Sequence, residues 1–248
     1  MIRKKHNEIE WLEFDQLQEF SNLKHAIFLS HGGVSPKPFQ SLNAGGSTGD
    51  DPAFVEENRR RILSFFPSGE LISSNQAHTT NVHLVEGHYT SQEACDGLIT
   101  KEKHKVLMIK HADCQAAIFY DPIENILANV HSGWRGNVQN IYGSTIEAMK
   151  KMGSNPNNIL VCISPSLGPE RSEFVNFRTE LPSHFQEFQW KDNYFNLWEI
   201  SRMQLKAAGI SPSHIECAEI CTYENKEDYF SYRRDKVTGR NATLCMLL

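Results

Sequence analysis

The sequence has no apolar run that approaches the ~20 residues needed to cross a lipid bilayer as a helix. It also lacks the pattern of an export signal, because the basic start, Met1 to His6, is followed by the polar stretch 7–10 instead of an apolar segment. We therefore expect neither a membrane protein nor a secreted one.

An excess of basic residues is also missing. The chain has 25 lysines and arginines against 30 aspartates and glutamates, a formal net charge of -5, whereas nucleic-acid-binding surfaces are basic. The six cysteines are scattered, and several lie in apolar segments where a reduced thiol behaves as a small hydrophobe. A cytoplasmic protein without a nucleic-acid partner is expected.

The chain shows no internal repeat, no low-complexity block and no long linker. Its 248 residues, 40% of them hydrophobic, are enough to bury one large core. We therefore expect a single domain over 1–248, in which 1–25 is a less certain N-terminal extension.

Short apolar or alternating runs, typical of β-strands, dominate the sequence. Strands are predicted at 26–30, 82–85, 97–100, 106–110, 116–120, 126–130, 159–164, 215–220, 229–232 and 243–247. Helices are predicted at 52–66, 140–152 and 197–208, where proline begins the first and glycine follows the other two. Clustered strands with helices inserted between them indicate a mixed α+β fold.

One pair of segments carries most of the functional information. Cys114 follows one predicted strand, and His131 lies at the end of the next but one. A tight turn at Asp121-Pro122 would bring both side chains to one end of a sheet. His78, between the apolar segment 71–72 and the strand at 82–85, is a third candidate. One cysteine and two histidines would supply the three protein ligands of an open catalytic zinc site.

Several short motifs occur in a fixed order between about His31 and the C-terminus. They are Ser41-Leu42-Asn43, Gly49-Asp50-Asp51-Pro52, Glu57-Asn58-Arg59-Arg60, His111-Ala112-Asp113-Cys114, Asn129-Val130-His131-Ser132-Gly133-Trp134-Arg135-Gly136, Phe230-Ser231-Tyr232-Arg233-Arg234-Asp235 and Thr238-Gly239-Arg240. Together they resemble the YfiH family, which is also called the laccase-domain or polyphenol oxidase family.

The resemblance implies a single-domain α+β sandwich that binds one zinc ion through His78, Cys114 and His131. Family members are described as enzymes that split adenosine, inosine, guanosine or methylthioadenosine with phosphate into base and (methylthio)ribose 1-phosphate, and that deaminate adenosine. The expected partners are therefore purine nucleosides and phosphate. Other members are linked to peptidoglycan editing, and the laccase label implies copper.

The sequence departs from the family pattern at three places. Gln76-Ala77-His78-Thr79 stands where Gln-Val-His-Gly is common, and His111 stands where many relatives have threonine. Residues 170–174 follow Gly168-Pro169 where many relatives have two cysteines and a tyrosine. The first two departures leave the expected metal ligands untouched, and the third concerns substrate preference.

Both reactions suit a zinc site with an anion clamp beside it. Three protein ligands leave zinc a fourth position for water, whose pKa falls toward ~7, and such water can attack C6 of adenine. Phosphorolysis needs phosphate held against C1′ of the ribose, and the planar fork of arginine suits that task. The expected catalytic residues are Cys114, His131 and Arg135. The expected substrate-binding residues are Asn43, Arg60, Arg135, Arg233 and Arg240.

For several other residues, a structural role is an alternative to a role in the site. His83 is expected to face away from His78 because it lies five residues further along, on a strand. His111 is expected to be structural rather than a ligand. Residues 45–49 precede a helix and suit either a phosphate nest or a plain turn. Trp134 is expected to be a core residue.

Three classes of function remain open. The first is the zinc-dependent nucleoside enzyme. The second is a metal-independent hydrolase or amidase, acting on a peptidoglycan precursor, in which Cys114 is the nucleophile and His131 its base. The third is a structural zinc protein, which is disfavoured because such sites normally have four protein ligands. Copper oxidase chemistry ranks lowest, because a multicopper cluster needs many more paired histidines. The preferred nucleoside and the oligomeric state stay open.

Overall fold

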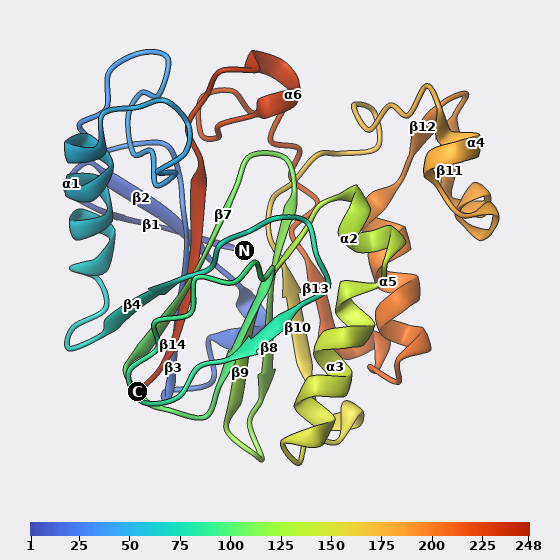
Figure 1. Cartoon of the computed structure of the whole chain (residues 1–248), viewed down its shortest axis with the longest axis horizontal. Coiled ribbons are helices and arrows are strands. Elements are labelled where there is room, and N and C mark those ends of the chain that lie inside the picture. Colours follow the sequence, from blue (N-terminus) through green and yellow to red (C-terminus); the bar gives the residue numbers. More distant parts are fainter.

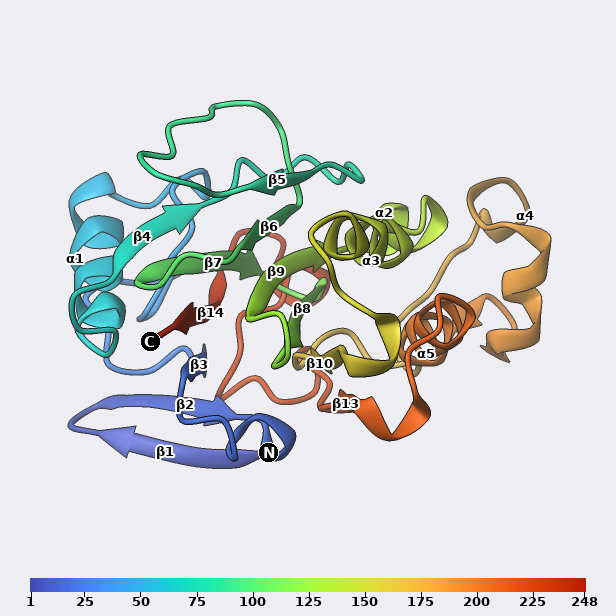
Figure 2. The same cartoon turned by 90° about the horizontal axis from the view of Figure 1, so that it is seen from below.

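Two six-stranded β-sheets face each other at the centre of the computed structural model, which describes residues 1–248 (Figures 1 and 2). The first sheet has the spatial order β1 (Ile2–His6), β2 (Ile9–Glu13), β3 (Leu23–Phe28), β14 (Asn241–Leu247), β7 (Lys105–His111), β4 (Glu70–Ser73). The second has the order β13 (Ile215–Cys217), β10 (Leu160–Ile163), β8 (Gln115–Asp121), β9 (Ile126–Ser132), β6 (Gly97–Thr100), β5 (Val82–Leu84).

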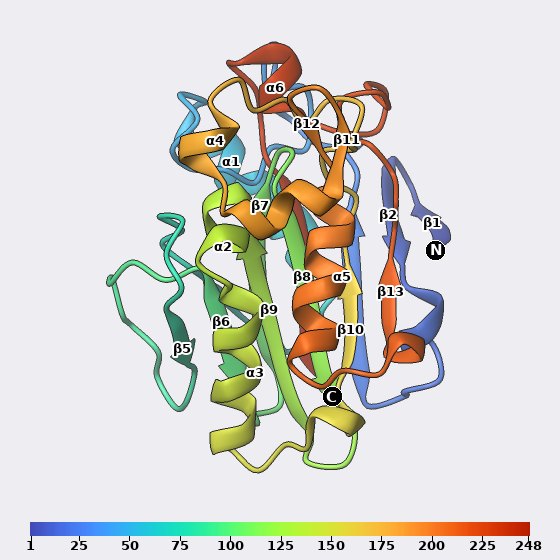
Figure 3. The ribbon, with the colours of Figure 1, turned by 90° about the vertical axis from the view of Figure 1, so that its right-hand side faces the viewer.

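Helices cover the outer face of each sheet. α1 (Pro52–Leu63) lies against the first sheet, and α2 (Trp134–Val138), α3 (Ile141–Lys151) and α5 (Leu197–Ala207) lie over the second (Figure 3). α4 (Phe177–Glu180), α6 (Tyr232–Asp235) and the hairpin of β11 (Gln189–Lys191) and β12 (Tyr194–Phe195) lie at one end (Figure 1). The expected α+β sandwich is confirmed.

Alternate residues of the central strands pack into different layers. In β7, Leu107 packs between the sheets, whereas Val106 and Met108 pack toward α1. In β8, Ile118 packs between the sheets and Phe119 packs toward α3. Both faces of these strands are buried, and for this reason they appear in the sequence as continuous apolar runs.

The strand predicted at 229–232 is wrong. The Ser231 side chain accepts the N–H of Arg234 at 3.3 Å, and Asp113 accepts the N–H of Arg233 at 2.6 Å, so the chain turns here into α6. Phe230 is buried and Tyr232 is 53% exposed, so the two do not share a face.

The first 25 residues contribute to the first sheet. β1 and β2 form an antiparallel hairpin, and Trp11 and Leu12 of β2 pair with Phe28 and Ile27 of β3. The segment expected as a less certain extension thus supplies two strands and the start of a third. None of the helices has the length and apolar character that a membrane span requires.

Candidate metal centre

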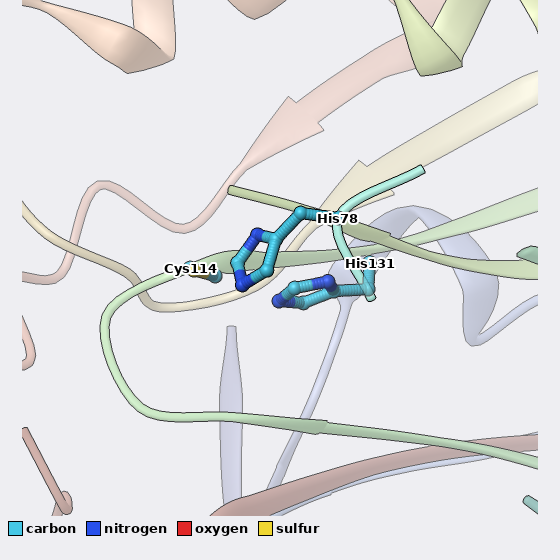
Figure 4. Close-up of side chains that lie close together, drawn as sticks. All are labelled: His78, Cys114 and His131. Carbon is cyan, nitrogen blue, oxygen red and sulfur yellow. The ribbon is translucent and has the colours of Figure 1, made fainter. Parts of the chain in front are cut away.

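Three parts of the chain meet at one end of the second sheet. Cys114 directly precedes β8, and β9 runs antiparallel to β8, which places His131 opposite Ala116. His78 lies between β4 and β5. One ligand atom from each of His78, Cys114 and His131 lies within 4.8 Å of the others, and Figure 4 shows the three side chains pointing toward one another. The structure thus brings the three expected ligands together.

The buried carboxylate of Asp96 positions both histidines. Its Oδ1 lies 2.8 Å from Nδ1 of His131 and accepts the backbone N–H of His78 at 3.1 Å. Its Oδ2 accepts the N–H groups of Ala77 at 3.2 Å and Thr79 at 2.6 Å, and the Thr79 hydroxyl at 3.0 Å. This cradle holds His78 at a φ of +58°. It also leaves Nε2 of His131 as the nitrogen available to a metal.

The same contacts set the charges of the site. Burial alone would raise the pKa of Asp96, but hydrogen bonds from His131 and Thr79 lower it to about 2. Burial alone would lower the pKa of His131, but the neighbouring Cys114 and the hydrogen bond to Asp96 raise it to about 9. Burial and the neighbouring His131 both lower the pKa of His78. Without a metal, the site therefore holds a His131–Asp96 ion pair beside a neutral His78 at pH 7.

A second aspartate fixes the turn before Cys114. Asp113 has a φ of +95°, a conformation that a non-glycine residue seldom adopts. Its carboxylate accepts hydrogen bonds from the Thr222 hydroxyl at 2.8 Å and from the N–H of Arg233 at 2.6 Å. Its carbonyl accepts the N–H of Leu167 at 2.8 Å. Three segments distant in sequence thereby hold the turn in place.

The residue after Ser132 must be small. A Cβ atom on Gly133 would lie 2.8 Å from Nδ1 of His78 and 2.9 Å from Sγ of Cys114. Both distances are shorter than van der Waals contact, so a larger residue would push two of the three metal-ligand candidates away. The glycine is needed here for space, because its φ of -82° is open to any residue.

The cluster opens into a cavity of about 870 Å³, a volume typical of small-molecule sites. Aromatic side chains and a glycine-rich loop supply part of its wall: Trp134, Phe174, Tyr232, and the loop Gly45-Gly46-Ser47. Lysines and arginines supply another part: Arg59, Lys110, Arg135, Arg233, Lys236 and Arg240. On a chain with a net charge of -5, this collection of positive charge is a local feature.

These cations have no carboxylate partners. The ion pairs of the protein involve arginines outside the cavity, namely Arg3, Arg60, Arg61, Arg171, Arg202 and Arg234. The arginines without an ion pair are Arg178 and the four that line the cavity. A group of cations without counter-charges raises the local positive potential and favours the approach of an anion.

The expected substrate-binding residues divide into two groups. Arg135, Arg233 and Arg240 line the cavity, and the guanidinium of Arg135 lies 4.2 Å from the centre of the Trp134 ring. Trp134 itself is therefore a cavity wall as well as a neighbour of Phe174, at 6.0 Å between ring centres. Residues 45–47 of the glycine-rich segment also reach the cavity.

Arg60 and Asn43, the other two expected substrate-binding residues, do not line the cavity. Arg60 is exposed on α1 and donates two hydrogen bonds to Glu57, because successive helix residues point about 100° apart and the neighbouring Arg59 takes the inward direction. Asn43 is fully buried, and its side-chain amide forms hydrogen bonds with protein partners: Gly45, Thr48, Asp50 and Arg240. It holds the glycine-rich loop and does not face the cavity.

The other histidines have structural partners. His83 lies 3.0 Å from the Tyr89 hydroxyl and is not part of the cavity wall. His111 is buried, its Nε2 lies 2.9 Å from the Thr243 hydroxyl, and burial lowers its pKa to about 3. It stays outside the three-residue cluster.

Residues 24–248 match a protein-family model described as multi-copper polyphenol oxidoreductase laccase. The chain is 32% identical, over 88% of its length and 90% of the relative's, to a protein of Escherichia coli K12 named purine nucleoside phosphorylase YfiH. The chain belongs to the YfiH family. A Bacteroides thetaiotaomicron relative, named purine nucleoside phosphorylase, is 31% identical over 90% of both chains.

Solved structures support membership of the YfiH family. A hypothetical protein YfiH from Bacillus licheniformis matches with a TM-score of 0.88 and 26% identity, over 99% of both chains. YlmD from Geobacillus stearothermophilus matches with a TM-score of 0.88 and 29% identity, over 98% of this chain and 97% of the other.

Replacing Asp96→Asn should destabilise the metal-free protein by about 2–4 kcal/mol, because it breaks a buried ion pair and leaves backbone donors without an acceptor. The lowered pKa of Asp96 gives stability that is present above about pH 4 and lost as pH falls toward 2. The raised pKa of His131 gives stability that is present below about pH 6.5 and lost as pH rises through 9.

Urea unfolding of chelator-treated protein at pH 5.5 and pH 9 measures this dependence. The stability difference between wild type and Asp96→Asn should be larger at pH 5.5. Asp121→Asn is the matched control, since Asp121 is also buried but accepts only the N–H groups of Ile123 and Glu124. An equal Asp96 effect at both pH values would contradict the assigned ion pair.

Gly133→Ala should lower zinc affinity at least tenfold, because the added methyl group displaces His78 or Cys114. Competition with a chromogenic chelator measures the affinity. Gly46→Ala is the control, since its added Cβ would meet only the Arg59 guanidinium at an ordinary 3.5 Å. Unchanged zinc affinity in Gly133→Ala would show that the three side chains do not bind the metal together.

Proposed function

We propose that the protein is a zinc-dependent purine nucleoside enzyme. It cleaves adenosine, inosine, guanosine or methylthioadenosine with phosphate, and it also deaminates adenosine. The observation that carries this proposal is the combination, in one cavity, of the His78–Cys114–His131 cluster with six unpaired cations. The names of the Escherichia coli and Bacteroides relatives support it.

The residues present suit a zinc ion. Two imidazole nitrogens and one thiolate form a donor set that zinc accepts, and three protein ligands leave one position free, as in catalytic sites. When bound, zinc supplies a Lewis acid that polarises oxygen and lowers the pKa of water. Asp96 fixes His131 by the carboxylate contact that zinc-binding histidines usually have.

Copper oxidase chemistry of the multicopper type fits this donor set poorly. Several copper ions held close together need several sets of histidines. His78, Cys114 and His131 form the single cluster of three or more potential ligands in the protein, which is enough for one ion. We therefore propose zinc ahead of copper, although the family model has a copper-based description.

The rest of the cavity suits the other reactants. In phosphorolysis, a phosphate oxygen forms a bond to C1′ while the bond from C1′ to the purine nitrogen breaks, and the base leaves with the electron pair. The unpaired arginines and lysines offset the charge of the phosphate. Trp134, Phe174 and Tyr232 offer flat apolar surfaces to the purine. In deamination, water adds at C6 and ammonia leaves.

A second candidate is a cysteine hydrolase acting on an amide of a peptidoglycan precursor. The observation that favours it is the chain of contacts from Cys114 through His131 to Asp96, since a nucleophile, a base and a group that orients the base form a catalytic triad. Activity of this kind survives chelation, whereas the zinc-dependent nucleoside reactions do not.

The state of the cysteines supports a proposal for the compartment. All six are free, including the buried Cys95, Cys162 and Cys245. Free thiols persist in a reducing environment. We accordingly propose a cytoplasmic location.

Incubation of zinc-quantified protein with adenosine, with and without phosphate, tests the proposal. Chromatography should show adenine and ribose 1-phosphate only when phosphate is present, and inosine in its absence. Cys114→Ala should lose its zinc and at least 100-fold of both rates, because one of three ligands is missing.

Cys217→Ala is the matched control for this experiment. Cys217 is half-buried, as Cys114 is, but lies on β13 and away from the cavity. It should keep both rates and the zinc. Zinc-loaded wild type that leaves adenosine, inosine and methylthioadenosine unchanged would refute the nucleoside proposal, and peptidoglycan precursors would be tested next.

A further inference from the structure

One wall of the cavity carries two cations that the sequence did not single out. Arg59 reaches it from α1 and Lys110 from β7. The loop Gly45-Gly46-Ser47 lines the same cavity. A Cβ atom on Gly46 would lie 3.5 Å from Nη2 of Arg59, so the loop packs against the guanidinium.

The ammonium group of Lys110 is fixed and lacks a counter-charge. It donates hydrogen bonds to the Ser73 hydroxyl at 2.7 Å and to the Ser74 carbonyl at 2.8 Å. An ammonium group has three donor hydrogens, so these two contacts leave one for a ligand. Burial, and then the charge of Arg59, lower the pKa of Lys110 to about 8.

Arg59 is fixed in the same way. Its Nε and Nη2 both donate to the Ala44 carbonyl, at 2.9 and 2.8 Å, and Nη1 has no protein partner. Its neighbours in sequence behave differently, since Arg60 and Arg61 both form ion pairs with Glu57. Burial lowers the pKa of Arg59, as expected for a cation without a carboxylate nearby.

The glycine-rich loop adds donors without charge. The N–H of Gly45 donates a hydrogen bond to Oδ1 of Asn43 at 2.9 Å. The N–H groups of Gly46 and Ser47 have no acceptor in the protein and lie at the cavity. Successive free N–H groups form the kind of concave backbone surface that binds phosphate oxygens.

Two other cations of the cavity lie over aromatic rings. Arg135 is 4.2 Å from the Trp134 ring centre, and Lys236 is 5.5 Å from that of Tyr232. Stacked cations and rings suit a flat aromatic base. The wall of Arg59 and Lys110 instead offers donors to a tetrahedral oxyanion.

We propose that Arg59, Lys110 and the loop Gly45-Gly46-Ser47 form the subsite that holds the phosphate dianion. Two adjacent cations repel each other and lose hydration when they are buried together, and a bound dianion offsets both costs. The role of this dianion as the nucleophile of phosphorolysis rests on the proposed function. The purine base then lies against the aromatic residues of the cavity.

Calorimetric titration of the zinc-loaded full chain with inorganic phosphate, without nucleoside, tests the subsite directly. Lys110→Met and Arg59→Met should each weaken phosphate binding at least tenfold, and Arg59→Lys should lose less than Arg59→Met because it keeps the charge. Arg60→Met is the matched control, one residue along the same helix, and should bind phosphate as wild type does. Circular dichroism and zinc content show whether each variant is folded.

Steady-state kinetics provide a second test of the phosphate subsite. In Lys110→Met and Arg59→Met, KM for phosphate should rise at least tenfold while KM for the nucleoside changes less than threefold. Wild-type affinity and wild-type KM for phosphate in both variants would overturn the subsite and leave the nucleoside proposal intact. Weakened phosphate binding in a protein that turns over no nucleoside would support the subsite and refute the proposed function.

Adenosine 5′-monophosphate distinguishes free phosphate from a phosphate ester. If it binds and inorganic phosphate does not, and if Lys110→Met abolishes that binding, the wall serves an ester and the assignment to free phosphate is wrong. Binding of inorganic phosphate that weakens in both variants supports the assignment.

Discussion

The site depends on the hydrogen bonds of one buried carboxylate. Asp96 accepts bonds from three consecutive N–H groups around His78 and from the ring of His131. The two histidines come from segments 53 residues apart in sequence (131 − 78), and Asp96, at the start of β6, is the group that both contact. A metal site needs its ligands held within a few tenths of an ångström, and the contacts of Asp96 position both histidines without an ion.

The arginines inside the cavity differ from those outside it in what holds their side chains. Outside the cavity most arginines are neutralised by nearby carboxylates, whereas those inside are held by backbone carbonyls or aromatic rings. A carbonyl orients a guanidinium without cancelling its charge, so the cavity stays positive in a protein whose net charge is -5. This separation concentrates positive charge at one place on an acidic protein.

Much of this could be predicted from the sequence. The central strands were readable because both of their faces are buried, and Cys114 and His131 were placed together by the β8–β9 hairpin. His78 was a candidate from its place between two apolar segments, and the family resemblance also implied it as a ligand. Asp96 was missed because an aspartate before a glycine at a strand start is the usual pattern of a turn.

Two other differences between the predictions and the structure have specific physical causes. Arg60 was chosen over Arg59 because the inward direction of a helix residue depends on how α1 packs, which the local pattern of three arginines does not reveal. The strand at 229–232 was predicted from local alternation, but a contact with Asp113, more than a hundred residues earlier, bends the chain into α6. Long-range contacts of this kind have no local signature.

X-ray absorption at the zinc edge, on the full chain loaded with one equivalent of zinc, shows which atoms bind the metal. A site of His78, Cys114 and His131 should give one sulfur at about 2.3 Å, two imidazole nitrogens at about 2.0–2.1 Å and one further light atom. A spectrum with no sulfur, or with two or more, would contradict a site built from His78, Cys114 and His131.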